Sequence, residues 1–170
     1  MKSQDILVAV ELLLQNGKKI TFAQLGKSLQ ISASETHGAI NRLKESFIYD
    51  SFTKMIRKTA LEEFLIHGIQ YAFPASLGKP ARGVLTGYSS PFMRDDFNVG
   101  KNDDVYIWPY SNGKDRGISI QPLYRSAPEV CLKNESLYHW LSTIDMLRLN
   151  RARQREIAII HLQNLFKDIK

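Results

Sequence analysis

Residues 20–48 read ITFAQLGKSLQISASETHGAINRLKESFI, and this stretch decides the fold of the chain. Thr21 is placed to cap the free backbone amides at the start of a helix. The apolar side chains that follow share one face of that helix; they are Phe22, Leu25 and Leu29. A turn at Gln30-Ile31 then ends it. The first part of the stretch therefore predicts a short amphipathic helix followed by a tight turn.

A second helix is predicted over residues 32–46. The sequence Ser32-Ala33-Ser34-Glu35 matches the reciprocal capping box, in which a serine and a glutamate each satisfy one free backbone donor. The buried stripe of this helix recurs at the spacing of helical turns and consists of Thr36, Ile40 and Leu43. Two helices joined by a short turn follow directly from these patterns.

The flanking segments complete a compact unit. An apolar stripe predicts a helix from Ser3 to Gln15, which Asn16-Gly17 ends because both residues tolerate the left-handed conformation. After the central helices, residues 47–49 and 54–57 are predicted to be short strands of a hairpin. A further helix is expected to begin at about Lys58 and to end before Phe73.

The order helix, link, helix, turn, helix, hairpin resembles a winged helix-turn-helix, a family that includes MarR-type regulators. The residues that carry the resemblance are Ile20-Thr21-x-x-Gln24-Leu25-Gly26-x-x-Leu29-x-Ile31-Ser32-x-Ser34, Ile40-x-x-Leu43 and Phe47-Ile48. In that family the third helix enters the major groove of DNA and the hairpin, or wing, contacts the adjacent backbone. The resemblance implies that helix 32–46 reads bases here.

Candidate DNA-binding residues follow from the side of this helix that faces away from its buried stripe. They are Ser32, Ser34, Glu35, His37, Gly38, Asn41 and Arg42. Asn and Arg side chains suit bidentate contacts with adenine and guanine. Glu35 is either a capping group only or an acceptor for a cytosine amine. Gly38 serves either close approach to DNA or another helix, or simple packing.

Four further cations are expected to contact phosphates, which fix the register of a protein on DNA without reading its sequence. They are Lys44, Lys54, Arg57 and Lys58.

Residues 74–170 have a different character. Three apolar segments, 83–88, 105–108 and 117–123, are predicted strands, and the polar residues 93–104 are a predicted loop. Helical periodicity returns at Asn134, and Asn150 is expected to cap a second C-terminal helix. The fold class is therefore α+β: a winged helix-turn-helix domain over residues 1–73, then a small, mostly antiparallel sheet and two C-terminal helices over residues 74–170.

The chain beyond the helix-turn-helix is also similar to a set of uncharacterised bacterial helix-turn-helix proteins, some of which are paired with toxin-like partners. The residues that carry that likeness are Phe64-Leu65-Ile66-His67-Gly68, Tyr71-Ala72-Phe73-Pro74, Ile107-Trp108-Pro109 and Arg148-x-x-Arg151-x-Arg153-x-Arg155-Glu156. Those arginines either bind phosphate or pair with Asp145 and Glu156 across helical turns, and a dimer interface is a further alternative.

Charge and composition fit a protein that contacts a polyanion. The net charge is +6, and residues 1–58 hold nine Lys and Arg against five acids. Cys131 is the single cysteine, which excludes a disulfide within the chain and favours a reducing, cytoplasmic compartment. The chain has no long apolar run and begins without a signal-peptide pattern, so membrane insertion and secretion are not expected.

Enzyme chemistry finds no support. The histidines at 37, 67, 139 and 161 lack the spacing of metal ligands, and the acid pairs Asp95-Asp96 and Asp103-Asp104 are typical of solvated turns. No phosphate-binding loop or catalytic serine motif occurs. No enzyme activity, cofactor or metal is expected.

The sequence thus predicts a sequence-specific DNA-binding regulator of transcription, a repressor, that binds double-stranded DNA as a homodimer held by its terminal helices. One alternative is an antitoxin-like module whose C-terminal half holds a toxin-like protein partner. Another is a regulator that senses a small effector.

Overall fold

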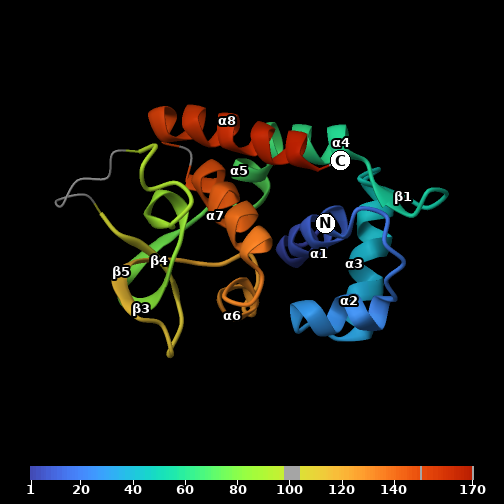
Figure 1. Ribbon diagram of the computed structural model, residues 1–170, viewed down its shortest axis with the longest axis horizontal. Coiled ribbons are helices and arrows are strands. Elements are labelled where there is room, and N and C mark those ends of the chain that lie inside the picture. The colour runs from blue at the N-terminus through green and yellow to red at the C-terminus, as the bar shows by residue number, and fades with distance from the viewer. Residues whose placement is uncertain (98–103, 150, 170) are drawn as a thin grey trace.

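The computed structural model describes residues 1–97, 104–149 and 151–169, and its fold is α+β, as predicted. Figure 1 shows helices α1, α2 and α3 with a small hairpin at one end of the molecule and the sheet at the other. Helix α7 lies between these two ends, and α8 runs across both of them along one side. Helix α7 is therefore the central helix of the molecule, with the N-terminal helices on one side of it and the sheet on the other.

The helices are α1 (Ser3–Gln15), α2 (Phe22–Leu29), α3 (Ala33–Glu45), α4 (Lys58–Glu63), α5 (Ile69–Ala72), α6 (Ala127–Cys131), α7 (Glu135–Leu149) and α8 (Ala152–Asp168). The strands are β1 (Tyr49–Asp50), β2 (Met55–Ile56), β3 (Leu77–Leu85), β4 (Tyr106–Pro109) and β5 (Asp115–Ile120). The predicted cap of the last helix, Asn150, lies outside the described residues.

Side-chain caps set the starts of α2 and α3. Thr21 and Gln24 form a reciprocal capping box, in which Thr21 Oγ1 accepts from the Gln24 amide at 3.1 Å and Gln24 Oε1 accepts from the Thr21 amide at 2.9 Å. Ser32 caps α3 by accepting from the Glu35 amide at 3.1 Å. The second half of the predicted Ser32–Glu35 box is absent, because the Glu35 carboxylate accepts from the Ser32 hydroxyl at 3.3 Å instead.

The turn between α2 and α3 requires glycine at position 26. A Cβ atom on Gly26 would lie 2.6 Å from the Ile31 carbonyl oxygen and 2.8 Å from Thr36 Oγ1. Gln30 turns the chain with a left-handed φ of 55°, and the Ile31 amide then donates to the Gly26 carbonyl at 2.8 Å. The backbone of α2 at Gly26 therefore packs directly against the Thr36 side chain of α3, with no room for a methyl group.

The wing is shorter than predicted. Strands β1 and β2 pair antiparallel over two residues each. Phe47, a predicted strand residue, instead has φ 58° and ends α3, since the Ile48 amide donates back to the Leu43 carbonyl at 3.0 Å. The first strand consequently begins only after this helix end has been closed.

The helix predicted from Lys58 contains a π-helical segment over Phe64–Gly68, between α4 and α5. A π-turn leaves backbone groups without their usual helical partners. The Ile66 carbonyl in this segment accepts from Arg155 Nη2 of α8. Arg155, one of the arginines of the predicted C-terminal cluster, thus serves as a hydrogen-bond donor to the backbone of the π-helical segment.

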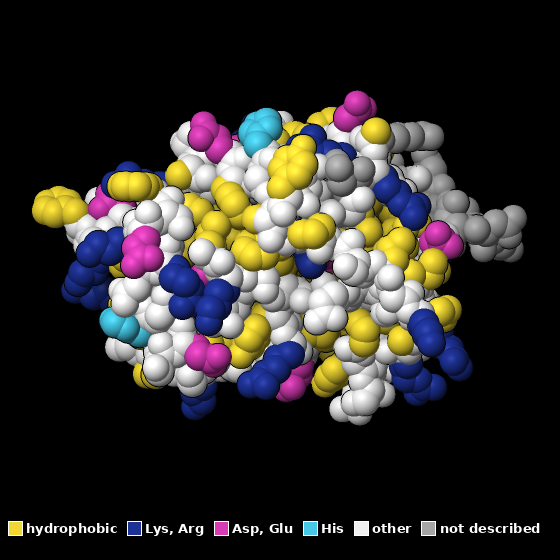
Figure 2. Space-filling view, turned by 180° about the vertical axis from the view of Figure 1, so that it is seen from behind, with side chains coloured by type: hydrophobic (Ala, Val, Ile, Leu, Met, Phe, Trp, Pro, Cys, Tyr) yellow, Lys and Arg dark blue, Asp and Glu magenta, His cyan; other side chains and the backbone are white. Residues whose placement is uncertain are grey.

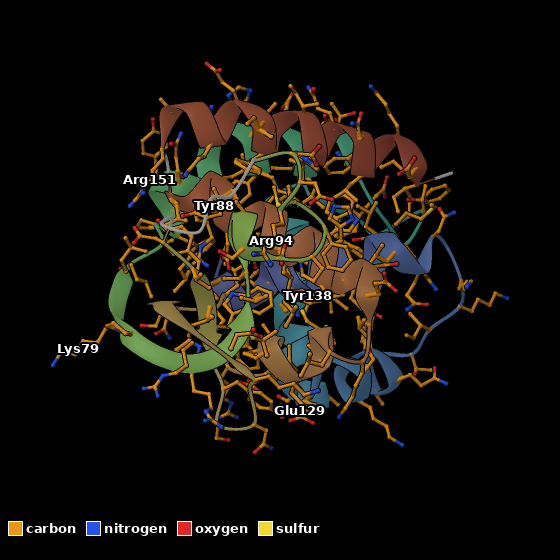
Figure 3. All side chains as sticks on the ribbon, turned by 60° about the vertical axis from the view of Figure 1, so that its left-hand side comes forward. Lys79, Tyr88, Arg94, Glu129, Tyr138 and Arg151 are labelled. Carbon is orange, nitrogen blue, oxygen red and sulfur yellow. The ribbon has the colours of Figure 1, made fainter. Side chains whose placement is uncertain are left out.

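Strands β3, β4 and β5 close into a small barrel. β3 pairs antiparallel with β4 and with β5, and β4 pairs parallel with β5 over two residue pairs. The sheet is therefore mostly antiparallel, as predicted, although β3 begins earlier than the predicted strand and ends before Tyr88. Figure 3 shows Lys79 of β3 extending outward, whereas Tyr88 and Tyr138 lie toward the interior.

Helix α7 is buried on nearly every side. Its Asp145 is 1% exposed and accepts from three side chains: Thr86 Oγ1 at 2.8 Å, Trp108 Nε1 at 2.5 Å and Arg148 Nη1 at 2.5 Å. Arg148 also donates to the Phe73 carbonyl at 2.8 Å. Burial raises the pKa of Asp145, and the arginine and the hydrogen bonds oppose that rise. This cluster joins α7 to the barrel and to the end of α5.

Polar contacts also join the two predicted domains, 1–73 and 74–170. Glu11 of α1 accepts from Asn134 Nδ2 at 3.2 Å, and Ser126, just before α6, donates to the Leu29 carbonyl at 2.6 Å. Helix α6 was not predicted from the sequence. One hydrophobic cluster includes buried side chains of both parts, such as Leu7 and Ile144. The boundary at residue 73 stays a prediction.

Two glycine-to-alanine changes test the tight helix–turn–helix contact. We expect Gly26→Ala to lower the free energy of unfolding by about 1–3 kcal/mol, because overpacking forces the backbone or Thr36 to move. Gly38→Ala is the matched control, since a Cβ there would meet only Arg42 Nη1, at 3.2 Å, a contact that a shift of a few tenths of an ångström relieves. It should be neutral or add up to about 1 kcal/mol through helix propensity. Urea unfolding followed by circular dichroism measures the free energy of unfolding of both variants. An equal change in the two would contradict the close contact at Gly26.

Candidate nucleic-acid interface

Helix α3 offers one continuous solvent-facing surface. Ser34, His37, Asn41 and Lys44 are exposed, and their spacing of three and four residues places them on the same side of the helix. The opposite side carries the buried Thr36, Ile40 and Leu43 as predicted. The Asn41 amide lies 3.4 Å from His37 Nδ1. A polar strip with an amide and an imidazole at its centre is therefore available to a partner.

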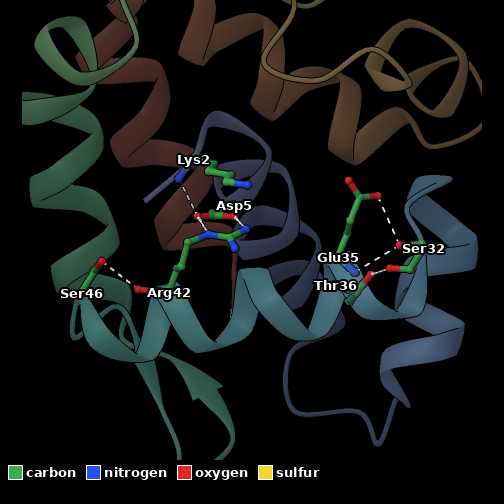
Figure 4. Close-up of polar contacts among 7 residues, drawn as sticks. All are labelled: Lys2, Asp5, Ser32, Glu35, Thr36, Arg42 and Ser46. Carbon is green, nitrogen blue, oxygen red and sulfur yellow. Dashed lines mark hydrogen bonds and ion pairs between the residues drawn. The ribbon is translucent and has the colours of Figure 1, made fainter.

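Arg42 does not belong to this strip. Its Nε donates to Asp5 Oδ2 at 2.8 Å and its Nη2 to Asp5 Oδ1 at 2.6 Å, a bidentate ion pair (Figure 4). Asp5 is 0% exposed, and its Oδ2 also accepts from the Lys2 amide at 2.6 Å. The hydrogen bond to Asp5 is the main reason that the pKa of Arg42 is raised. Arg42 thus holds α3 against α1 and is not free to reach a guanine.

Glu35 lies beside Ser32 on the first turn of α3, on the same flank as Arg42 (Figure 4). Glu35 and Arg42 are seven residues, or about two helical turns, apart. Their flank faces away from the strip of His37 and Lys44. Of the two readings of Glu35, the geometry favours the capping role, and a carboxylate placed there is directed away from a phosphate that approaches the strip.

The helical glycine at position 38 is half-buried and touches no other helix closely. The nearest atom to a Cβ built on it is Arg42 Nη1 of the same helix. Close packing against a second helix is therefore not its role within the described residues. Approach to an external partner stays a prediction.

The cations of the wing have unequal surroundings. Lys54 is exposed and has a left-handed φ of 58° at the end of the hairpin turn. Arg57 lies 3.6 Å from Asp50, whose pKa is lowered mainly by the hydrogen bond that it accepts from the Phe52 amide. Lys58 Nζ donates to the Ile169 carbonyl at 2.7 Å, near the end of α8. Lys54 is thus the best placed of the three to contact phosphate.

An aromatic side chain stands at the tip of the wing. Phe52 is 96% exposed, more than any other large apolar side chain of the described residues. Figure 2 shows this protruding tip at one edge of the molecule, with Lys and Arg side chains gathered below it and single acidic side chains among them. Phe52 was not among the predicted site residues, because an apolar residue in a hairpin turn is indistinguishable from a core residue until its burial is known.

A groove opens between the wing, α3 and the link that joins α1 to α2. It has a volume of about 820 Å³, and its lining includes the predicted His37, Asn41, Lys44, Lys54 and Lys58. Lys18 and Lys19 of the link line it as well. Neither lysine was among the predicted site residues, although two adjacent lysines beside a helix-turn-helix were the available signal.

Two of the C-terminal arginines, Arg148 and Arg155, have partners inside the protein, whereas Arg151 is exposed. Arg148 pairs with the buried Asp145, which is the i, i+3 pairing that the sequence left open. Arg155 serves the π-helical segment, and Arg151 lies over the Tyr106 ring at 5.8 Å. These three do not form a phosphate-binding cluster. The side chain of Arg153 lies outside the described residues.

Comparison of the chain with known proteins found no matching family model, no matching curated protein and no matching solved structure. Within the described residues, no helix is both long and apolar enough to cross a membrane. The same part of the chain holds no cluster of three or more His, Cys, Asp and Glu side chains arranged for a metal ion.

The Asp5–Arg42 pair gives a test of what holds α3 in place. We expect Asp5→Asn to lower the free energy of unfolding by about 1–3 kcal/mol, because it leaves a partly buried guanidinium without its charged partner. Asp50→Asn is the control, as it alters the more exposed pair with Arg57. Chemical denaturation of both variants measures the difference. A midpoint for Asp5→Asn no lower than that of Asp50→Asn would contradict the structural role of the pair.

Proposed function

We propose that this protein is a DNA-binding regulator of transcription that reads the major groove with helix α3. The observation that carries the proposal is the exposed strip on α3, with Asn41 at its centre and Lys44 beside it, next to the cationic wing. An α-helix fits the major groove, and an asparagine amide can pair with an adenine edge there. Lys54 and the link lysines flank the strip at positions suited to the neighbouring phosphates.

The base-reading set that we propose is smaller than the predicted one. It comprises Ser34, His37 and Asn41, whereas Arg42 positions the helix and Glu35 belongs to its cap. The phosphate contacts that we propose are those of Lys44 and Lys54, joined by Lys18 and Lys19. A cytoplasmic location accompanies this proposal, and the buried Cys131 thiol is compatible with it.

The homodimer and the antitoxin-like alternative stay predictions. Ile160 is 58% exposed and is the one large apolar side chain among the exposed, described residues of α8. Tyr71 of α5 is 77% exposed. Exposed apolar side chains of this kind are compatible with a protein partner.

DNA binding itself is tested by fluorescence anisotropy with labelled duplexes of random sequence at low and physiological salt. We expect wild-type affinity to fall steeply with salt, because phosphate neutralisation releases counterions. Lys44→Gln and Lys54→Gln should each weaken binding to every sequence and reduce the slope of log affinity against log salt by roughly 1. Lys79→Gln, on the outer side of β3, is the control and should leave both unchanged. A folded wild-type protein that fails to bind at low salt would refute the proposal.

Sequence reading is tested on a duplex obtained by selection from a random pool. Asn41→Ala should weaken binding to the selected site by about 1–3 kcal/mol, since a bidentate amide–base contact is lost. Its binding to random duplexes should not change. Asn164→Ala, an exposed asparagine on α8, is the matched control. If Asn41→Ala weakens selected and random duplexes equally, Asn41 does not read a base.

A further inference from the structure

The groove beside α3 is large enough for a small organic molecule. Its volume of about 820 Å³ falls within the range of roughly 300–1,000 Å³ that is usual for ligand pockets. Its walls come from the link, from α3 and from the wing. Its apolar lining comes from α1, α2, α3, the link and β2, and consists of Leu12, Leu13, Ile20, Phe22, Ile40, Met55 and Ile56.

The groove exists because the link does not join the wing as a third strand. Asn16 and Gly17 are both left-handed, with φ of 47° and 77°, and turn the chain sharply at the end of α1. Residues 18–21 then run without strand structure, and the hairpin remains two-stranded. Met55 of β2 reaches toward the link, since a Cβ on Gly17 would lie 3.7 Å from its Cε. The space between link and hairpin is left open on one side.

The charge of the lining is of one sign. Five lysines line the groove; they are Lys18, Lys19, Lys44, Lys54 and Lys58. None of the described residues that line it is acidic. Lys58 already donates to the Ile169 carbonyl, but the four exposed lysines of this set repel one another across the groove, and a bound anion relieves that repulsion. The groove is therefore complementary to a negatively charged molecule.

The lining also offers flat, apolar surface. Phe22 is 40% exposed, and its ring lies 5.7 Å from the His37 ring at the groove wall. Tyr49 and the flexible Met55, 40% exposed, complete this part of the lining. Aromatic rings and a methionine thioether pack well against a planar ring, and methionine adapts to ligands of different shape.

We propose that this groove is a binding site for a small amphipathic anion, a ring-bearing molecule with carboxylate, sulfonate or phosphate groups. The ring packs on the apolar lining, and the anionic groups meet the lysines of the link and the wing. Because His37, Asn41, Lys44 and Lys54 line the same groove, an occupant competes with DNA for them. The competition rests on the proposed function, whereas the binding of the anion does not.

The probe is 8-anilinonaphthalene-1-sulfonate, an aromatic sulfonate whose fluorescence rises in an apolar site. We expect saturable binding of one molecule per chain. The double variant Lys18→Glu/Lys54→Glu should weaken it by about tenfold or more, since two cations beside the bound anion are replaced by two anions. Lys79→Glu/Lys114→Glu makes the same change of charge away from the groove and should leave binding unchanged. Equal weakening in both variants, or in neither, would overturn the proposal.

Displacement of the probe identifies the ligand class. Displacement by 1-naphthoate but not by adenosine monophosphate assigns the groove to aromatic carboxylates, and the reverse result assigns it to nucleotide phosphates. Displacement by neither compound at millimolar concentration would contradict the proposed chemistry.

A duplex DNA titration separates the two proposals. Release of the probe by DNA supports competition at a shared site. Probe binding in the groove by a protein that does not bind DNA would leave the ligand site standing and refute the DNA proposal. DNA binding by a protein that shows no groove-dependent probe binding would refute the ligand site alone.

Discussion

The burial of Asp145 inside the central helix α7 is the constraint on which the rest of the structure depends. An isolated carboxylate in a protein interior costs several kcal/mol, so it is stable only when surrounding donors are in place. Those donors come from Thr86 and Trp108 of the barrel region and from Arg148 of the same helix. Arg148 in turn donates to the Phe73 carbonyl, at the end of α5. The barrel, α7 and the α5 region must therefore assemble together, because the absence of any one leaves a buried charge unsatisfied.

A second buried carboxylate, that of Asp5, holds helix α3 in place. Asp5 is buried in α1 and accepts from Arg42 of α3, so the tilt of α3 is set by a pair inside the protein rather than by the turn alone. Helix α1 is itself held against α7, in part through Glu11 and Asn134. Polar contacts therefore connect the start of α7 to α1, and α1 to α3, the helix that carries the exposed strip around Asn41. A rigidly supported helix suits recognition, because contacts to bases tolerate only small displacements.

The local parts of this fold could be predicted from the sequence, and the long-range parts could not. Helices α1, α2 and α3 follow from apolar stripes and from caps such as Thr21, which act within a few residues. The role of Arg42 was not accessible in the same way, whereas the local pairing of Arg148 with Asp145 was one of the alternatives that the sequence offered. Arg42 meets its partner across 37 residues, and Thr86 meets Asp145 across 59. The parallel pairing of β4 with β5 and the π-helical segment likewise depend on distant packing. Phe47 was predicted to lie in a strand because its side chain favours one. It instead takes a left-handed φ and ends α3, because the chain turns there.

Three arginines have partners inside the protein, whereas four of the five groove lysines are exposed, and the chemistry of the two side chains accounts for this difference. A guanidinium is weakly hydrated and forms forked hydrogen bonds, so it suits buried pairs and backbone carbonyls. Arg42, Arg148 and Arg155 are all used in this way. An ammonium is strongly hydrated and stays at the surface. The lysines of the link and the wing accordingly remain around the groove, without acidic neighbours among its described lining. The capacity of this surface for a polyanion therefore depends on its lysines, and counting all basic residues overstates it.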